Sequence, residues 1–208
     1  MSRVYDCAKP EERDTGIEEA AAALRGGELV VLPTDTVYGV AADAFLPQAI
    51  QALLTAKGRD RSMPVPVLVA SPGMLNALVD KMPETAAALT EQFWPGALTL
   101  VLRHTSHLVW DLGDSKGTVA VRMPASELAQ DLITRTGPLA VSSANRSGHA
   151  AATTMMDARL QLGASVSVYL DGGPSGGTLA STIVDVTGKQ PRLLRAGALD
   201  LAALRAVV

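Results

Sequence analysis

The chain is poor in cysteine, in aromatic residues and in excess charge of either sign, and each shortage excludes a class of protein. A lone cysteine, Cys7, has no partner for an internal disulfide, which is typical of a reducing compartment. Lys and Arg number 18 against 21 Asp and Glu, whereas a general nucleic-acid binder is strongly basic. Because 48% of the residues are hydrophobic and only 3% aromatic, we expect a core of alanine and aliphatic side chains.

Long apolar runs are also missing. The first 14 residues, MSRVYDCAKPEERD, are polar and lack the apolar stretch of a signal peptide. No apolar run approaches the length of about 20 residues that a membrane-spanning helix needs. These features predict a soluble, cytoplasmic protein.

Familiar catalytic and phosphate-binding motifs are absent. The sequence has no G-x-x-x-x-G-K-[ST] and no G-x-G-x-x-G after a strand. The glycine-rich segment 171–178 contains the letters of a nucleophile elbow around Ser175, but no helical pattern follows it. His104 and His107 lack the further ligands that a metal site requires, and Cys7 lacks a partner base. We therefore predict neither a metal site nor a covalent nucleophile.

Helical and extended patterns alternate irregularly along the 208 residues, with no internal repeat and no linker. This order predicts one α/β domain over residues 1–208, with a twisted mixed sheet and flanking helices. We expect its core at about 17–197, an N-terminal arm at 1–14 and a C-terminal helix at 199–208. Thr15-Gly16-Ile17-Glu18 fits a capping box and predicts that the first helix starts there.

Further local patterns predict where other elements begin. Ser71 and Thr154 are expected to cap helices. Pro124 is expected to begin another helix, directly after a strand over 118–122.

The segment 29–70 carries two polar clusters on the connections of one β-α-β unit. The apolar run 29–32 predicts a buried strand and leads into the hydroxyl-rich turn Thr34-Asp35-Thr36. Pro47 opens an amphipathic helix that ends at Lys57-Gly58, just before Arg59. Ligands of α/β proteins commonly bind at such connections.

Further cations and hydroxyls follow other predicted strands. Each one alone is commonly structural, because loops are polar and cations often stabilise helix ends. Together, donor-rich loops without a catalytic dyad favour a site for an anionic ligand such as a nucleotide. Arg122 stands out because it ends an apolar strand, where an unpaired charge would be costly. The residues are Lys57, Arg59, Arg61, Arg122, Ser143, Asn145, Ser181, Thr182 and Arg195.

Seven motifs in one order resemble a known family. They are PTDTVYGVAADAF, KGR followed by SMPVP, WPGALTLVL, VAVRMP, SSANRSG, STIVDV and RLLRAG. From about Leu29 to Gly197 the chain resembles the YrdC-like family of threonylcarbamoyl-adenylate synthases, in its short single-domain form. The K-x-R and S-x-N elements are specific only in combination. The resemblance implies a YrdC-like fold with a concave, positive cleft.

The resemblance also implies a reaction. L-threonine and bicarbonate would give N-carboxythreonine, whose carboxylate attacks the α-phosphate of ATP and releases pyrophosphate. Threonylcarbamoyl-AMP would then serve downstream transferase proteins that make N6-threonylcarbamoyladenosine in tRNA. Mg²⁺ would be the cofactor and would be carried with ATP, held by phosphates and water.

Roles for individual residues follow from the same resemblance. Lys57 and Arg59 would be the catalytic pair facing the phosphates. Thr34, Thr36, Arg122 and Ser181 would bind L-threonine. Arg59, Thr118, Ser143, Asn145, Thr153 and Arg195 would bind ATP. The chain departs from the family pattern at Asp60, Met63, Ser142 and Leu68, which leaves the roles of Met63, Leu68 and Arg61 open.

Two other functions remain open at this point. A double-stranded RNA- or tRNA-binding module could use a basic face with Lys57, Arg59, Arg61 and Arg146, although the acidic balance and few aromatics count against it. A carbamoyl-AMP-forming carbamoyltransferase domain normally belongs to longer chains with zinc fingers. The oligomeric state and direct tRNA contact are left open. The base for the threonine amine is open too, with Lys57 as one candidate.

Overall fold

The computed structural model describes residues 1–207, and its strands form one ten-stranded sheet. The strands are β1 (Arg3–Asp6), β2 (Val30–Leu32), β3 (Gly39–Asp43), β4 (Val67–Leu68), β5 (Leu98–Arg103), β6 (Thr118–Arg122), β7 (Leu139–Ser143), β8 (Val168–Asp171), β9 (Thr182–Asp185) and β10 (Arg192–Arg195). The helices are α1 (Pro10–Arg25), α2 (Pro47–Lys57), α3 (Pro72–Leu78), α4 (Glu84–Phe93), α5 (Glu127–Thr136), α6 (Met155–Leu162) and α7 (Leu201–Arg205), with a 3-10 turn at Gly163–Ser165.

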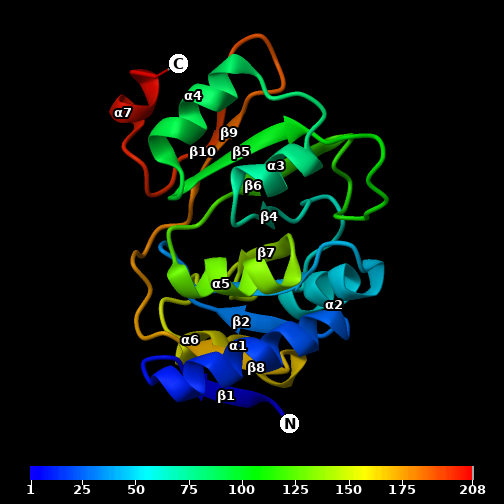
Figure 1. Cartoon of the computed structure of the whole chain (residues 1–208), viewed down its shortest axis with the longest axis vertical. Coiled ribbons are helices and arrows are strands. Elements are labelled where there is room, and N and C mark those ends of the chain that lie inside the picture. The colour runs from blue at the N-terminus through cyan, green and yellow to red at the C-terminus, as the bar shows by residue number, and fades with distance from the viewer. Residues whose placement is uncertain (208) are drawn as a thin grey trace.

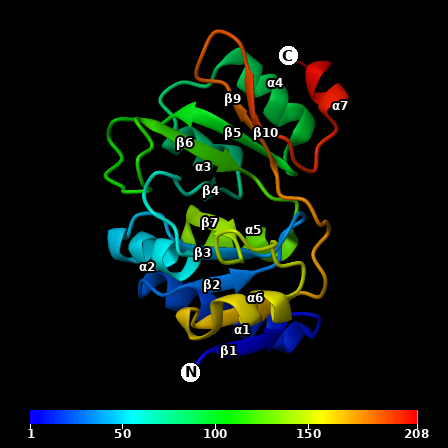
Figure 2. The same ribbon diagram turned by 180° about the vertical axis from the view of Figure 1, so that it is seen from behind.

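The sheet is mixed, as predicted. Its order is β1-β8-β2-β3-β7-β4-β6-β5-β9-β10. β8 pairs in parallel with β1 and β2, whereas β3 and β7 pair antiparallel in the middle of the sheet. The strands follow one another along the long axis of the molecule, from β1 near the N-terminus to β10, and helices lie on both faces (Figures 1 and 2). The α/β class with flanking helices is therefore confirmed.

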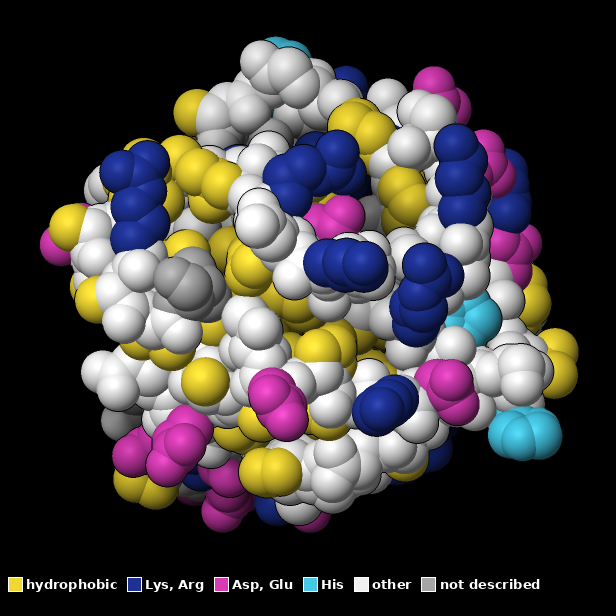
Figure 3. Space-filling view, turned by 90° about the horizontal axis from the view of Figure 1, so that it is seen from above, with side chains coloured by type: hydrophobic (Ala, Val, Ile, Leu, Met, Phe, Trp, Pro, Cys, Tyr) yellow, Lys and Arg dark blue, Asp and Glu magenta, His cyan; other side chains and the backbone are white. Residues whose placement is uncertain are grey.

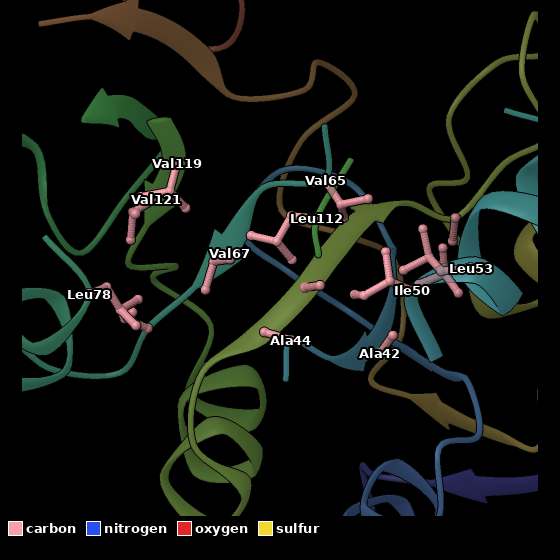
Figure 4. Packing of buried hydrophobic residues seen from close by; sticks show 14 of the residues in the cluster. Ala42, Ala44, Ile50, Leu53, Val65, Val67, Leu78, Leu112, Val119 and Val121 are labelled. Carbon is pink, nitrogen blue, oxygen red and sulfur yellow. The ribbon is translucent and has the colours of Figure 1, made fainter. Parts of the chain in front are cut away.

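One face of the sheet centre is packed with aliphatic side chains. The register places Val67 of β4, Val121 of β6 and Leu100 of β5 in one row. This row belongs to the main core cluster, together with Leu78 of α3 and Ile50 of α2 (Figure 4). The aliphatic core expected from the shortage of aromatics is thus observed.

The residues adjacent to this row point to the opposite face of the sheet, because side chains alternate along a strand. The register puts Leu68 beside Arg122, and Thr99 beside Ile183. Leu68 packs in the second core cluster, to which α1 and α5 contribute. Leu68 also lines a cavity, together with Arg122, Thr99 and Ile183. Part of this face of the sheet therefore borders the cavity.

Several local predictions are confirmed. α2 spans Pro47–Lys57, as its pattern predicted, and β6 has the predicted bounds. Ser71 caps α3, since its hydroxyl accepts a hydrogen bond from the N–H of Met74 at 3.2 Å. Thr154 caps α6 in the same way through the N–H of Asp157, at 3.1 Å. α7 lies inside the predicted segment 199–208, of which residue 208 is outside the described part.

The predicted start of the first helix is wrong. The segment 1–14, expected as an N-terminal arm, carries the edge strand β1, which pairs with β8, and α1 already begins at Pro10. Pro10 in the first turn, followed by Glu11 and Glu12, favours a helix start there, because proline needs no N–H partner and carboxylates stabilise the helix N-terminus. Thr15 is no cap, since its hydroxyl bonds to the carbonyl of Glu11 within the helix, at 3.0 Å.

The start of α5 was also predicted too early. The helix begins at Glu127 and not at Pro124, and Ser126 caps it by accepting from the N–H of Ala129 at 3.3 Å. The carbonyl oxygen of Pro124 instead accepts a hydrogen bond from the side-chain amide of Gln130, at 2.7 Å. Within residues 1–207, no helix has the length and hydropathy that a membrane span would need.

Candidate active site

A cavity of about 280 Å³ lies over the exposed part of the sheet. The face seen in Figure 3 is hollowed, and Lys and Arg side chains gather around the hollow. Seven of the predicted site residues line this cavity, although they come from distant segments of the chain. They are Thr34, Thr36, Arg59, Arg122, Ser143, Ser181 and Arg195.

Arg122 is held from three sides at the inner end of β6. Its Nε donates to the carbonyl of Gly96 at 2.8 Å, Nη1 to the hydroxyl of Thr36 at 2.8 Å, and Nη2 to Asp35 at 2.5 Å. Its side chain is only 7% exposed. Burial lowers the pKa of the Arg122 guanidinium, and the carboxylate of Asp35 opposes that shift. The group is thus a fixed cation in the cavity wall.

The threonine turn after β2 forms a directed chain of hydroxyls. Thr36 accepts from Arg122, and its hydroxyl lies 3.0 Å from that of Thr34. Thr34 donates onward to the carbonyl of Val37 at 2.6 Å, so the proton between the two hydroxyls belongs to Thr36. Both side chains are buried. The turn therefore presents hydroxyl oxygens of fixed orientation to the cavity.

Arg195 and Ser181 form a second cation–hydroxyl unit. Arg195 donates from Nε to the carbonyl of Ser181 and from Nη2 to its hydroxyl, both at 3.0 Å. The hydroxyl of Thr99, on β5, lies 2.7 Å from that of Ser181. Burial lowers the pKa of Arg195, and the positive charges of Arg122 and Arg59 lower it further. These three cations are therefore close enough to repel one another.

Arg59 has a donor without a partner. Its Nε is buried and makes no hydrogen bond to any described residue, while Nη1 donates to the hydroxyl of Ser142 at a long 3.4 Å. Burial lowers the pKa of this guanidinium. A buried, unsatisfied N–H is unfavourable unless a ligand completes it. Three guanidinium groups at one cavity suit an anionic ligand with several charges.

Lys57 is not among the residues that line the cavity, and its ammonium is bonded to the 143–145 loop. Its ammonium donates to the carbonyl of Ser143 and to the carbonyl of Asn145 at 2.7 Å, with the Asn145 amide oxygen at 3.5 Å. Only 1% of the residue is exposed. Burial, and secondly the charge of Arg59, lower the pKa of Lys57 to about 7. Its three donors bind the 143–145 loop, so none of them points to an incoming phosphate.

Three more predicted ATP contacts also lie outside the lining. The amide of Asn145 donates to the carbonyls of Arg146 at 2.9 Å and His149 at 2.7 Å, which shapes its own loop. Thr118 sits at the far end of β6 from Arg122, and its hydroxyl donates to the carbonyl of Ser115. The hydroxyl of Thr153 is 3.5 Å from Asp157.

The structure also adds residues that sequence reasoning missed or left open. Asp35, which orients Arg122, was read only as part of a turn. Its position between Thr34 and Thr36, both predicted to bind L-threonine, was the available signal. Met63 and Leu68, whose roles were open, both line the cavity as apolar wall. Arg61 is directed away and pairs with Asp111.

The glycine-rich segment 171–178 packs against the threonine turn. The N–H of Gly177 donates to the carbonyl of Thr36 at 3.1 Å. A Cβ on Gly176 would lie 2.8 Å from the carbonyl oxygen of Asp35, so only glycine permits this approach. Tyr38 donates from its hydroxyl to the carbonyl of Gly173 at 2.5 Å. The segment is thus a support for the site, and no helix follows Ser175 to make it a nucleophile elbow.

Comparison with known proteins assigns this architecture to a family. A model of the Sua5, YciO and YrdC proteins, described as "Telomere recombination", matches residues 22–197. The chain belongs to the Sua5/YciO/YrdC family. This agrees with the resemblance seen in the seven sequence motifs.

Individual family members match over nearly the whole chain. A Mycobacterium leprae protein, provisionally designated threonylcarbamoyl-AMP synthase, is 55% identical over 208 residues, covering 100% of this chain and 94% of its own. The crystal structure of Pyrococcus abyssi Sua5 complexed with L-threonine has a TM-score of 0.89 and 38% identity, and covers 92% of this chain. This chain spans 57% of that longer Sua5. E. coli YciO has the same fold, with a TM-score of 0.84 at 21% identity, covering 97% of this chain and 98% of its own.

Proposed function

We propose that this chain is an L-threonylcarbamoyladenylate synthase. The amine of L-threonine and bicarbonate form a carbamate with loss of water. A carbamate oxygen then attacks the α-phosphorus of ATP, and the bond to the departing pyrophosphate breaks. The family and the names of the relatives support this reaction.

The observation that carries the proposal is the anchored Arg122. Three of its five N–H donors are held by Gly96, Thr36 and Asp35, which leaves two for a ligand. An oriented guanidinium of this kind suits the carboxylate of an amino acid. The L-threonine complex of Pyrococcus abyssi Sua5 shows that a relative of the same fold binds this substrate.

The remaining cations suit the triphosphate. Arg59 brings an unsatisfied donor, and Arg195 brings a guanidinium fastened to Ser181. Transfer to phosphorus depends mainly on positioning and on neutralising charge, so the reaction needs no protein nucleophile. Lys57 positions the loop that carries Ser143, through its hydrogen bonds to the carbonyls of Ser143 and Asn145.

Mg²⁺ fits this site only as part of the nucleotide complex. Among residues 1–207 no three His, Cys, Asp or Glu side chains gather into a metal-binding group. Asp35, the carboxylate beside the cavity, is already paired with Arg122. Mg²⁺ would therefore be coordinated by phosphate oxygens and water, and would neutralise charge on the leaving pyrophosphate.

The product would supply a further reaction. A mixed carbamic–phosphoric anhydride is an activated acyl donor, so a transferase acting on an adenosine of tRNA would consume it, with release of AMP. We expect this to take place in the cytoplasm, where tRNA and ATP are available.

The test measures pyrophosphate release while each substrate is omitted in turn. Release should require L-threonine, bicarbonate and ATP together, and mass spectrometry should detect threonylcarbamoyl-AMP. L-serine should be used less well by about 1–3 kcal/mol, the usual value of one methyl group. Equal release without threonine would contradict the proposal.

Substitution of Arg122 by Ala sharpens the same test. Loss of the charge-assisted pair with the carboxylate should weaken threonine binding by about 2–4 kcal/mol, seen as a higher KM for threonine. The KM for ATP should change much less. An unchanged threonine dependence in this variant would remove Arg122 from the substrate site.

A further inference from the structure

The connection between β5 and β6 is unusually long. The two strands are antiparallel neighbours, for which a hairpin loop of about two to five residues is usual. Here residues 104–117 make the connection. Loops of this length with no secondary structure are commonly functional. No role in the reaction has so far been given to this loop.

The loop is anchored to the protein at several points. Leu112 is buried in the main core cluster. Trp110 stacks on Phe45 with ring centroids 5.7 Å apart, and His104 meets Trp110 edge-on at 5.7 Å. The N–H of Thr105 donates to the carbonyl of Leu78 at 3.0 Å. His104 is thus part of an aromatic cluster.

The tip of the loop is fastened to the segment that follows Arg59. Arg61 makes a bidentate pair with Asp111, through Nη1 at 2.9 Å and Nη2 at 2.5 Å. Two backbone hydrogen bonds accompany it: from Asp114 N–H to the Arg61 carbonyl at 2.8 Å, and from Val65 N–H to the Leu112 carbonyl at 2.9 Å. Segments 50 residues apart are therefore joined on both backbone and side chain.

Gly113 allows the two backbones to approach this closely. Its φ is +103°, and a Cβ there would lie 2.8 Å from the Arg61 carbonyl oxygen and 3.3 Å from Cα of Pro64. Any other residue would therefore push the loop and the 61–64 segment apart. Gly117, in the same loop, also has a positive φ of +79°, but nothing lies within 4 Å of its Cβ position.

The fastened segment is a wall of the cavity. Arg59, Met63, Pro64 and Pro66 all line it, and Arg61 lies between them on the outside. Within residues 1–207, the side chain of Arg59 makes one hydrogen bond, a long one to Ser142, and its buried Nε has no partner. Its position therefore depends on the backbone that carries it.

We propose that the β5–β6 loop is a buttress for the phosphate-binding wall, with Asp111 and Gly113 as positioning residues. By holding Arg61 and the backbone of 61–65, they keep Arg59 in place for the polyphosphate of the nucleotide. The identity of that ligand rests on the proposed function. Neither residue is among those that line the cavity.

Two variants with matched controls test the buttress. Asp111→Asn removes the ion pair; its control is Glu19→Gln, which removes the remote Arg3–Glu19 pair of similar exposure (49%/38% against 47%/43%). Gly113→Ala introduces the clash; its control, Gly117→Ala, also places alanine at a positive φ, of +79°, but without a clash. Each variant is titrated with Mg-ATP, and its KM for ATP and for threonine is measured alongside its Tm.

Asp111→Asn should weaken ATP binding about 2- to 5-fold, the range of a well-formed exposed pair. Gly113→Ala should weaken it about 10-fold, because the wall itself moves. The KM for threonine should stay within 2-fold in both. Arg61→Gln combined with Asp111→Asn should be no worse than either alone, since the pair acts as a unit.

Three results would overturn the buttress. One is ATP affinity in Asp111→Asn and Gly113→Ala equal to that of their controls. Another is a parallel rise of both KM values, which would indicate a general loss of structure. The third is additive loss in the double variant. A wild-type protein that binds Mg-ATP but makes no threonylcarbamoyl-AMP would instead refute the proposed function, and the ATP titrations would still decide the role of the loop.

Discussion

The carboxylate of Asp35 joins two parts of the site. It accepts from Arg122 and from the backbone N–H of Ala125, at 3.0 Å. Asp35→Asn would keep the shape but remove the charge that fixes Arg122. Breaking a buried pair in this way costs about 3–5 kcal/mol, of which we expect about 1–2 kcal/mol in threonine affinity. The KM for threonine should rise accordingly. The control is Asp131→Asn, which removes an exposed ion pair with Arg13 and should leave the KM for threonine unchanged. Equal threonine KM values in both variants would contradict this.

The lowered pKa of Lys57 leads us to expect that the stability of the protein depends on pH. This pKa falls from 10.5 in the unfolded chain to about 7 in the fold. Between these values the unfolded chain binds more protons, so the free energy of unfolding rises with pH. Urea unfolding at pH 7 and 9.5 should show a rise of about 1–3 kcal/mol in the wild type that is missing in Lys57→Met. Identical pH profiles of the two proteins would show that Lys57 keeps an ordinary pKa.

At the scale of residues, the sequence indicated charge and location better than contacts. Arg122 could be singled out because a cation ends an apolar strand, and the structure places it at the cavity. Lys57, at a helix end, carried a weaker signal, and its acceptors lie 86 and 88 residues further along the chain. Local patterns hold no information about such partners. Asp35 was missed for the same reason, since Arg122 is 87 residues away.

Among the elements, α2 sets the distance between the threonine turn and Arg59. Its end is fixed by Gly58, which caps the helix in the left-handed conformation with φ 63°. Nothing lies within 4 Å of a Cβ on Gly58, so Gly58→Ala adds backbone strain alone. We expect a loss of about 1 kcal/mol in the free energy of unfolding. Gly73→Ala, inside α3 without a positive φ and with its nearest neighbour at 3.7 Å, is the control and should cost less. Equal losses would argue against the cap.

Capping side chains indicated some helix starts correctly, but Ser126, the cap of α5, was overlooked in favour of Pro124. Ser71 and Thr154 cap their helices as expected. α1 begins before Thr15, because Pro10 and two acidic residues favour a helix start there and because β1 pairs with β8 beside it. The two-residue strand β4 lies between β7 and β6. Strand order of this kind depends on contacts across the whole sheet, which periodicity does not reveal.

In the whole molecule, the cavity spans the two halves of the sheet, which adjoin at β4. Thr36 and Ser143 come from the half with β2, β3 and β7. Arg122, Ser181 and Arg195 come from the half with β6, β9 and β10. A ligand that contacts both sets links segments that are far apart in sequence. Its binding free energy is therefore added to the stability of the whole domain.

Thermal unfolding with ligands tests this coupling. At about 100 times its Kd a ligand adds about 2.7 kcal/mol, which should raise the Tm by about 5–10 °C for a chain of this size. We expect Mg-ATP to raise the Tm in both the wild type and Arg122→Ala, because Arg59 and Arg195 remain. L-threonine, added with Mg-ATP and bicarbonate, should raise it further only in the wild type, because Arg122 is the carboxylate's partner. An equal threonine effect in Arg122→Ala would place the amino acid elsewhere. A ligand effect confined to one of two separate unfolding transitions would show that the two halves of the sheet unfold independently.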